Sequence, residues 1–228
     1  MRQNLRPCIY ASQSRLTMLE ANGIGCLRGE RRLFADIGFS VSEGQLLRVA
    51  GANGSGKTSL LRILCGLLSP SEGEVLWNAR PIASLREDYH RVLAYIGHLN
   101  GLKDEMTPHE NLAVASTLAG APAGREDRLK ALDGFGVAHC ADLPVRYLSQ
   151  GQRRRASLAR LALHGPARIW ILDEPFNALD AGAVMCMERL ITGHVAAGGI
   201  VVFATHLEVA ITAVSLVLVN LDHQADRA

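Results

Sequence analysis

Three glycines, a lysine and a threonine fall within the eight positions from Gly51 to Thr58. Glycine lets the backbone turn tightly and approach a ligand closely, and lysine adds a positive charge. The spacing Gly51-x-x-x-x-Gly56-Lys57-Thr58 follows an apolar run and precedes a helical pattern, which is the context of a phosphate-binding loop (P-loop). The segment 51–59 is therefore predicted to bind the phosphates of a nucleotide.

Each residue type in this loop has an expected task. Backbone N–H groups at the start of the helix bind phosphate oxygens, the Lys57 ammonium contacts the β- and γ-phosphates, and the Thr58 hydroxyl holds Mg²⁺. A chance glycine-rich turn is the alternative, and the flanking strand and helix patterns argue against it. The expected nucleotide-binding residues are Gly51, Ala52, Asn53, Gly54, Ser55, Gly56, Lys57, Thr58 and Ser59.

Two acids follow a buried strand in the segment "RIWILDEP", which starts at Arg168. Ligands of parallel sheets bind at the carboxyl ends of the strands, so both carboxylates are expected near the phosphates. Asp173 is the candidate Mg²⁺ ligand, and Glu174 is the candidate general base that polarises the attacking water. Without a P-loop in the chain, the segment could equally be a strand that ends in solvated acids.

A polar turn, "LSQGQ", precedes a basic helical pattern and begins at Leu148. This turn resembles the signature motif of ATP-binding-cassette (ABC) ATPases. Gly151 precedes Asp173 by 22 positions and His206 follows Asp173 by 33, both as in that family. A helix N-terminus with a serine hydroxyl suits a γ-phosphate, which gives the motif its physical sense.

The resemblance implies that two copies of the chain share their nucleotides. In the family, the residues at Ser149, Gly151 and Gln152 bind the nucleotide held by the other subunit. The segment "NALD" resembles the D-loop that crosses the same interface and places Asp180 there. A head-to-tail dimer with two ATP molecules at its interface is therefore expected.

The resemblance also implies the catalytic and metal-binding residues. His206 follows a buried strand and matches the switch histidine that contacts the γ-phosphate and orients the base. The implied catalytic residues are Lys57, Glu174 and His206, and the implied Mg²⁺ ligands are Thr58 and Asp173. ATP and Mg²⁺ are the implied cofactors.

Two positions depart from the family pattern. His98 stands where the family usually has a glutamine that contacts Mg²⁺ and links to the transmembrane partner. We keep His98 as a candidate metal-site residue, with the role of its loop open. Arg28 stands near the position of the aromatic residue that stacks on adenine, and a guanidinium group can also stack on a base.

Several longer segments resemble the ATP-binding subunit of the bacterial cytochrome c maturation system, which is often called the haem exporter. They are "YIGHLNGLKDEMTPHENL", "LPVRYLSQGQRRRASLARL" and "IWILDEPFNALD". The Gly97-His98 pair, where most ABC ATPases have glutamine, is shared with that subfamily. The resemblance implies Mg²⁺-dependent ATP hydrolysis that powers haem export or the release of a haem-loaded chaperone.

The same resemblance implies a location and partners. Integral membrane subunits would hold the chain peripherally at the cytoplasmic face of the bacterial inner membrane, and they would handle the haem. Two alternatives stay open: an ATP-binding subunit for another substrate, and a soluble ABC ATPase without a transport role.

Composition excludes several other classes. The net charge of +2 predicts no nucleic-acid partner, and Arg153, Arg154 and Arg155 are expected to form a solvated helix face. The five cysteines show no C-x-x-C spacing, which argues against a disulfide framework or a metal site. No apolar stretch is long enough to span a membrane, and the nearest one runs from Val209 to Leu221.

Strands alternate with helices, which indicates an α/β fold with a mostly parallel sheet covered on both faces. The resemblance implies a P-loop NTPase (RecA-like) core with an antiparallel β subdomain and a helical subdomain inserted at about 100–163. Residues 18–228 are expected to form one domain, and residues 1–17 a disordered extension. The predicted elements include strands at 46–50 and 168–173 and helices at 59–68, 153–164 and 183–197.

Overall fold

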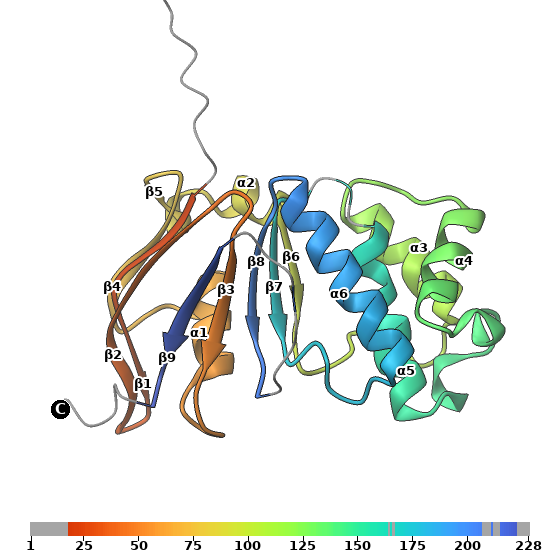
Figure 1. Ribbon diagram of the computed structural model, residues 1–228, viewed down its shortest axis with the longest axis horizontal. Coiled ribbons are helices and arrows are strands. Elements are labelled where there is room, and N and C mark those ends of the chain that lie inside the picture. The colour runs from red at the N-terminus through yellow and green to blue at the C-terminus, as the bar shows by residue number, and fades with distance from the viewer. Residues whose placement is uncertain (1–17, 164, 166, 207–210, 212–214, 223–228) are drawn as a thin grey trace, which may run out of the picture.

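A computed structural model of the chain describes residues 18–163, 165, 167–206, 211 and 215–222 (Figure 1). The extension expected for residues 1–17 lies outside this described part. The described residues form one parallel and one antiparallel sheet with helices packed beside them. The predicted α/β class is confirmed.

The parallel sheet has the strand order β6-β7-β8-β3-β9, and every neighbouring pair is parallel. The strands are β6 (Leu93–Ile96), β7 (Ile169–Asp173), β8 (Ile200–Ala204), β3 (Leu46–Ala50) and β9 (Leu216–Asn220). Every residue of β7 and β8 is buried, as the continuous apolar runs of these strands predict. Because the strands are parallel, their carboxyl ends share one edge of the sheet.

The antiparallel sheet has the order β2-β1-β4-β5. Its strands are β1 (Met18–Arg28), β2 (Arg31–Ser42), β4 (Glu72–Trp77) and β5 (Arg80–Pro81). Register shifts interrupt the pairing of β1 with both neighbours, so its buried residues do not alternate regularly. Such register shifts are typical of β-bulges, which add a residue to one strand of a pair.

Helix α1 (Lys57–Leu64) follows the P-loop and is shorter than predicted. The prediction extended it to residue 68, but Gly66 has a positive φ of 70° and ends the helix. Leu67 and Leu68 are consequently exposed instead of packed in the helix face.

The connection from β6 to β7 contains α3 (Pro108–Leu118), α4 (Arg125–Gly134) and α5 (Gln150–Ala159). Helix α6 (Ala181–Ala196) connects β7 to β8, and the short α2 (Arg86–Arg91) precedes β6. Single 3-10 turns complete the described part at Ile82–Ser84, Ala138–Cys140, Val145–Tyr147 and Arg160–Leu163. Helix α5 begins three residues before the predicted start at Arg153, because Ser149 and Gln152 form a capping box.

The parallel sheet separates two buried clusters. Ile169 and Ile171 of β7 face the cluster that α1 shares with the antiparallel sheet. Trp170 and Leu172 face the cluster that α4, α5 and α6 cover. Figure 1 shows these helices on the opposite side of the sheet from α1. Apolar packing on both faces fixes the strands, so the loops at their carboxyl ends have a rigid base.

Candidate functional site

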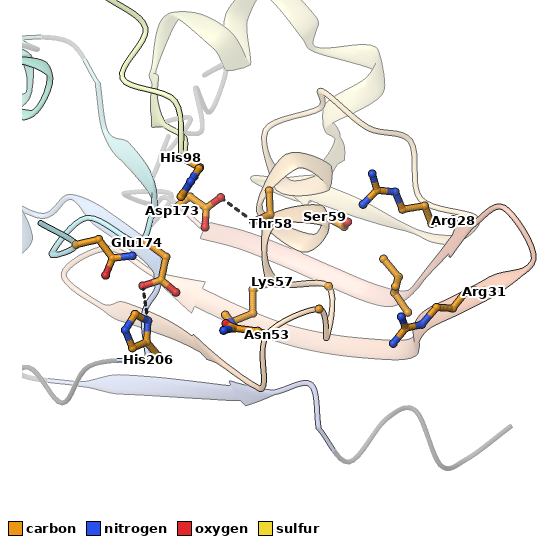
Figure 2. Close-up of a pocket in the computed structure, with 14 residues that line it drawn as sticks. Arg28, Arg31, Asn53, Lys57, Thr58, Ser59, His98, Asp173, Glu174 and His206 are labelled. Carbon is orange, nitrogen blue, oxygen red and sulfur yellow. Dashed lines mark hydrogen bonds and ion pairs between the residues drawn. The ribbon is translucent and has the colours of Figure 1, made fainter. Parts of the chain in front are cut away.

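A pocket of about 550 Å³ opens at the carboxyl edge of the parallel sheet (Figure 2). Residues that follow four of its strands line this pocket: the P-loop after β3, His98 after β6, Asp173 and Glu174 at the end of β7, and His206 after β8. The end of β1 and the start of β2 also contribute to its wall, through Arg28, Arg31 and Leu33. The topology therefore brings together residues that are far apart in the sequence.

The P-loop takes a shape that depends on its glycines. Gly51, Gly54 and Gly56 all have positive φ values, of 146°, 83° and 104°. A Cβ atom on Gly56 would lie 2.9 Å from a ring carbon of Phe34 and 3.2 Å from Cβ of Leu33. Strand β2 thus packs directly on the loop and holds it against the start of α1.

The Lys57 side chain is buried and folds back over the loop. Its Nζ donates hydrogen bonds to the carbonyls of Gly51, at 2.7 Å, and of Ala52, at 3.0 Å. The Ala52 N–H donates to Asp222 Oδ1 at 2.6 Å. Sequence analysis missed Asp222, which lies about 170 residues away from Ala52 and belongs to no motif. These bonds hold the loop in place, and the N–H groups at the helix start have no hydrogen-bond partner among the described residues, which suits an anion site.

Thr58 and Asp173 meet at the centre of the pocket. The Thr58 hydroxyl donates to Asp173 Oδ2 at 2.8 Å, which joins α1 to the end of β7 (Figure 2). Asp173 is 2% exposed. A hydroxyl and a carboxylate at this separation form a pair of hard oxygen ligands of the kind that Mg²⁺ binds.

Glu174 and His206 lie below Asp173 and to the left of Lys57 in Figure 2, where a dashed line joins them. His206 Nδ1 and Glu174 Oε2 are 3.1 Å apart, and the Glu174 side chain is mostly buried while that of His206 is half exposed. Glu174 has a positive φ of 49°, which is unusual for a non-glycine residue. Its backbone N–H donates to the Ala204 carbonyl at 2.9 Å, so the end of β8 helps to hold it.

His98 lines the same pocket from the loop after β6. At the opposite end, Figure 2 shows Arg28 and Arg31 on the far side of the P-loop from the two acids. The structure thus places Arg28 in the pocket wall. Arg31 and Asn177 also line the pocket, and the sequence analysis had assigned neither of them to it.

The predicted solvated face of three arginines is wrong. Arg154 is only 6% exposed, and it donates to the carbonyls of Gly97, Asp173 and Glu174 at 3.0, 3.0 and 2.8 Å. Burial lowers the pKa of Arg154, and the nearby Asp173 and Glu174 charges oppose that shift. The other two arginines pair with acids: Arg153 with Asp104 at 2.9 Å and Arg155 with Asp180 at 2.8 Å.

A helical pattern could have revealed the buried arginine. Once α5 starts at Gln150, Arg154 lies on the same face as Ser157, Leu158 and Leu161, all of which are buried. This spacing of three, four and seven residues is that of one helix face turned toward the core. The burial of Arg154 was not predicted, because three consecutive arginines indicate a solvated surface.

The signature residues lie apart from the pocket. Ser149 Oγ accepts from the Gln152 N–H at 3.3 Å, and Gln152 Oε1 accepts from the Ser149 N–H at 2.9 Å. Neither these two nor Gly151 is among the described residues that line the pocket. Asp180 caps α6 by accepting from the Ala183 N–H at 2.9 Å. Within one chain, therefore, the signature and the P-loop do not form a common site.

Comparison with known proteins agrees with this geometry. The ABC transporter family matches residues 34–177. The chain belongs to the ABC transporter family. It is an ATP-binding subunit of the CcmA type and an ATPase.

Two relatives show the extent of the match to this ABC subunit. The "Cytochrome c biogenesis ATP-binding export protein CcmA" of Aromatoleum aromaticum is 51% identical over 83% of this chain and 88% of its own length. The protein of the same name from Nitrosomonas europaea is 47% identical over 89% of this chain and 95% of its own length.

Solved structures show the same ABC fold. A putative ABC transporter ATP-binding protein from Pyrococcus furiosus superimposes with a TM-score of 0.78 at 24% identity, over 91% of this chain and 98% of its own. The ATP-binding subunit of another ABC transporter gives a TM-score of 0.74 at 25% identity, over 83% of this chain and 80% of its own. None of the helices in the described part of the chain has the length and apolar character needed to span a bilayer.

Proposed function

We propose that the chain hydrolyses ATP with Mg²⁺ to power a membrane-embedded export complex in cytochrome c maturation. Its output there would be haem export or the release of a haem-loaded chaperone. The observation that carries this proposal is the 51% identity to a cytochrome c biogenesis ATP-binding export protein over most of both chains. Integral membrane subunits would hold the chain peripherally at the cytoplasmic face of the bacterial inner membrane.

The P-loop residues 51–59 would bind the triphosphate. The N–H groups at the start of α1 and the Lys57 ammonium supply the positive charge, and the helix dipole adds to it. Ser55 Oγ is buried and has no hydrogen-bond partner among the described residues, so a polar group of the ligand would satisfy it. When a phosphate is present, Lys57 would exchange one of its loop carbonyls for a phosphate oxygen.

Thr58 and Asp173 would hold Mg²⁺, and His98 could add a ligand or a hydrogen bond from the loop after β6. The buried Asp173 carboxylate and the Thr58 hydroxyl already lie 2.8 Å apart, which supports this assignment. The ion would neutralise charge on the β- and γ-phosphate oxygens. The protein's own task is to keep both oxygens fixed at the strand end.

Glu174 would act as the general base toward the attacking water. Its carboxylate is mostly buried, which suits a group that must accept a proton in a site with little water. His206 Nδ1 lies 3.1 Å from this carboxylate and would hold it in one orientation, since a protonated Nδ1 donates to it. The other ring nitrogen of His206 would face the γ-phosphate.

The catalytic site would be completed by a second copy of the chain in a head-to-tail dimer. The separation of the signature residues from the pocket within one chain supports this arrangement. Ser149 Oγ and the first N–H groups of α5, at Gly151 and Gln152, would meet the nucleotide of the partner subunit. Asp180 would lie close to the two-fold axis.

The first test is the substitution Glu174→Gln. We expect ATP turnover to fall by roughly 10²–10⁴-fold, the usual contribution of a general base, while ATP affinity persists. Glu126→Gln is the matched control, because this carboxylate on α4 is 81% exposed and pairs only with Lys130 at 2.7 Å among the contacts described. Glu174→Gln protein with nearly full turnover would show that another group is the base.

A second readout addresses the biological role. In the organism that encodes the chain, we expect deletion of its gene to remove covalently attached haem from c-type cytochromes. The parent chain should restore it and the Glu174→Gln chain should not. If c-type cytochromes persist in the deletion strain, recovery of the chain with membranes would favour transport of another substrate. Recovery in the soluble fraction would favour an ABC ATPase without a transport role.

A further inference from the structure

We propose that Arg154 is a positioning residue that fixes the backbone of the catalytic base and links it to the signature helix. The proposal rests on the assignment of Glu174 as the base. Arg154 lies in α5, five residues after Ser149, and its guanidinium group reaches the carboxyl ends of β6 and β7. All the hydrogen bonds described for its guanidinium group go to backbone carbonyls, so its effect would pass through the backbone.

The guanidinium group of Arg154 joins three segments at once. Nη1 donates to the carbonyl of Gly97, which precedes His98. Nη2 donates to the carbonyls of Asp173 and Glu174, at 3.0 and 2.8 Å. The planar fork of an arginine side chain matches such a set of acceptors, whereas a lysine ammonium is a single point on a flexible stem.

Glu174 requires this support because of its backbone conformation. A φ of 49° is unfavourable for a residue with a side chain, and it persists only where the surroundings hold it. The Glu174 N–H is bonded to Ala204, and its carbonyl accepts both from Arg154 and from the Asn177 N–H at 3.3 Å. Among the described bonds to the Glu174 backbone, the one from Arg154 alone comes from the helical segment between β6 and β7.

This link gives the signature helix an effect on the base. Ser149 and Gln152 cap the N-terminus of α5, which would meet the nucleotide of the partner subunit. Arg154 lies on the next turn of the same helix and bonds directly to Glu174. A displacement of α5 on dimer formation would therefore move the Glu174 carbonyl. The Glu174 carboxylate would then be oriented for catalysis only when the N-terminus of α5 is bound at the nucleotide of the partner subunit.

A neighbouring arginine provides the matched control. Arg160 lies just after α5, is partly buried, and donates to a β6 carbonyl, that of Tyr95, at 3.3 Å. No hydrogen bond from Arg160 to Glu174 or Gly97 is found among the described residues. Arg160→Met therefore removes a partly buried guanidinium group from the same helical segment and leaves the proposed positioning contact in place.

The experiment compares Arg154→Met, Arg154→Lys and Arg160→Met in the full-length chain. Thermal unfolding, ATP affinity and turnover are measured for each. We expect Arg154→Met to lower kcat by about 10–100-fold with KM and ATP affinity changed by less than about threefold, since a small displacement of a catalytic group has that cost. Arg154→Lys should recover part of the loss, and Arg160→Met should lower the melting temperature with kcat nearly unchanged.

A double substitution separates this proposal from the assignment of the base. If Arg154 acts through Glu174, adding Arg154→Met to Glu174→Gln should cost less than about threefold further in turnover. If Arg154→Met lowered turnover in the Glu174→Gln chain by as much as it does in the parent chain, the positioning role would be overturned and the base assignment would stay intact. If Glu174→Gln alone retained turnover, the base assignment would fail first. Should Arg154→Met not fold, Arg154→Lys with kcat equal to the parent would overturn the proposal.

Discussion

At the scale of single residues, Lys57 shows how the chain prepares the pocket for an anion. Its ammonium group is buried and bonded to two loop carbonyls, so its charge is already in place before a nucleotide arrives. The cost of burying the charge is offset by these bonds. A triphosphate then provides better partners than neutral carbonyls, because hydrogen bonds between charged groups are stronger.

Lys57→Ala should therefore weaken the binding of Mg²⁺-ATP. Loss of a hydrogen bond to a charged group costs about 1.5–3 kcal/mol, which corresponds to roughly a 10–100-fold higher Kd. Titration calorimetry can measure it. Lys130→Ala on α4 is the charge-matched control, since Lys130 is 69% exposed and far from the motif in sequence. An unchanged Kd for Lys57→Ala would argue against the phosphate-binding role of this loop.

Residues in a motif were predictable from the sequence, and residues that only support a motif were not. The contact between Thr58 and Asp173 follows from a P-loop and a strand that end at one sheet edge, even though 115 positions separate them. The Asp222 side chain supports the P-loop by accepting one hydrogen bond from the Ala52 N–H, and no sequence motif predicts this contact. Arg154 was hidden because a run of charges usually indicates a solvated surface.

At the scale of elements, the packing of α6 against β7 includes a titratable contact. The His194 ring stacks on Trp170 with centroids 4.0 Å apart and planes at 9°. A Cβ atom on Gly199 would overlap the His194 ring, so the glycine after α6 makes room for this stack. Burial lowers the pKa of His194 below its ordinary value of 6.5, and the bond to the Arg168 carbonyl opposes this only partly.

The lowered pKa gives a pH dependence with a defined sign. The unfolded chain binds a proton on His194 more readily than the folded chain does. The free energy of unfolding should therefore be highest above about pH 6.5 and fall as the pH drops toward the folded pKa. His109, whose pKa is lowered by burial and by Arg128, acts in the same direction.

Urea unfolding of the parent chain and of His194→Phe, at about pH 7.5 and about pH 5.5, tests whether His194 contributes to the pH dependence of stability. Phenylalanine keeps an aromatic ring on Trp170 but cannot take up a proton. We expect a smaller loss of stability on acidification in the variant, with a residual loss from His109. The same loss in both proteins would show that His194 does not contribute.

Element boundaries were predictable where periodicity was regular. Strands β3 and β7 match their predictions within one residue because they are continuous apolar runs. Strand β9 lies within the apolar run that ends at Leu221, but most of its side chains are exposed or partly exposed, so no alternation marked it. The predicted start of α5 was three residues late because its cap residues belong to the signature turn.

At the scale of the whole molecule, the two sides of the parallel sheet have different tasks. One side carries α1 and the antiparallel sheet, which contribute part of the wall of the P-loop pocket. The other side carries α4, α5 and α6, and the N-terminus of α5 holds the signature. Arg154 and the pair Arg155–Asp180 connect the signature helix to the strand ends and to α6. In the proposed head-to-tail dimer, a site divided in this way would be completed by the facing copy.

The size of the Glu174→Gln chain in Mg²⁺-ATP, with and without Ser149→Arg, tests this division most directly. Because the Glu174→Gln chain should hydrolyse ATP slowly, it should accumulate as a dimer, and light scattering would measure this dimer. An arginine at position 149 should place bulk at the nucleotide of the partner subunit and leave a monomer that still binds ATP. Thr117→Arg, on the exposed surface of α3, is the control and should dimerise normally. A Ser149→Arg protein that dimerises as fully as its parent would contradict the account.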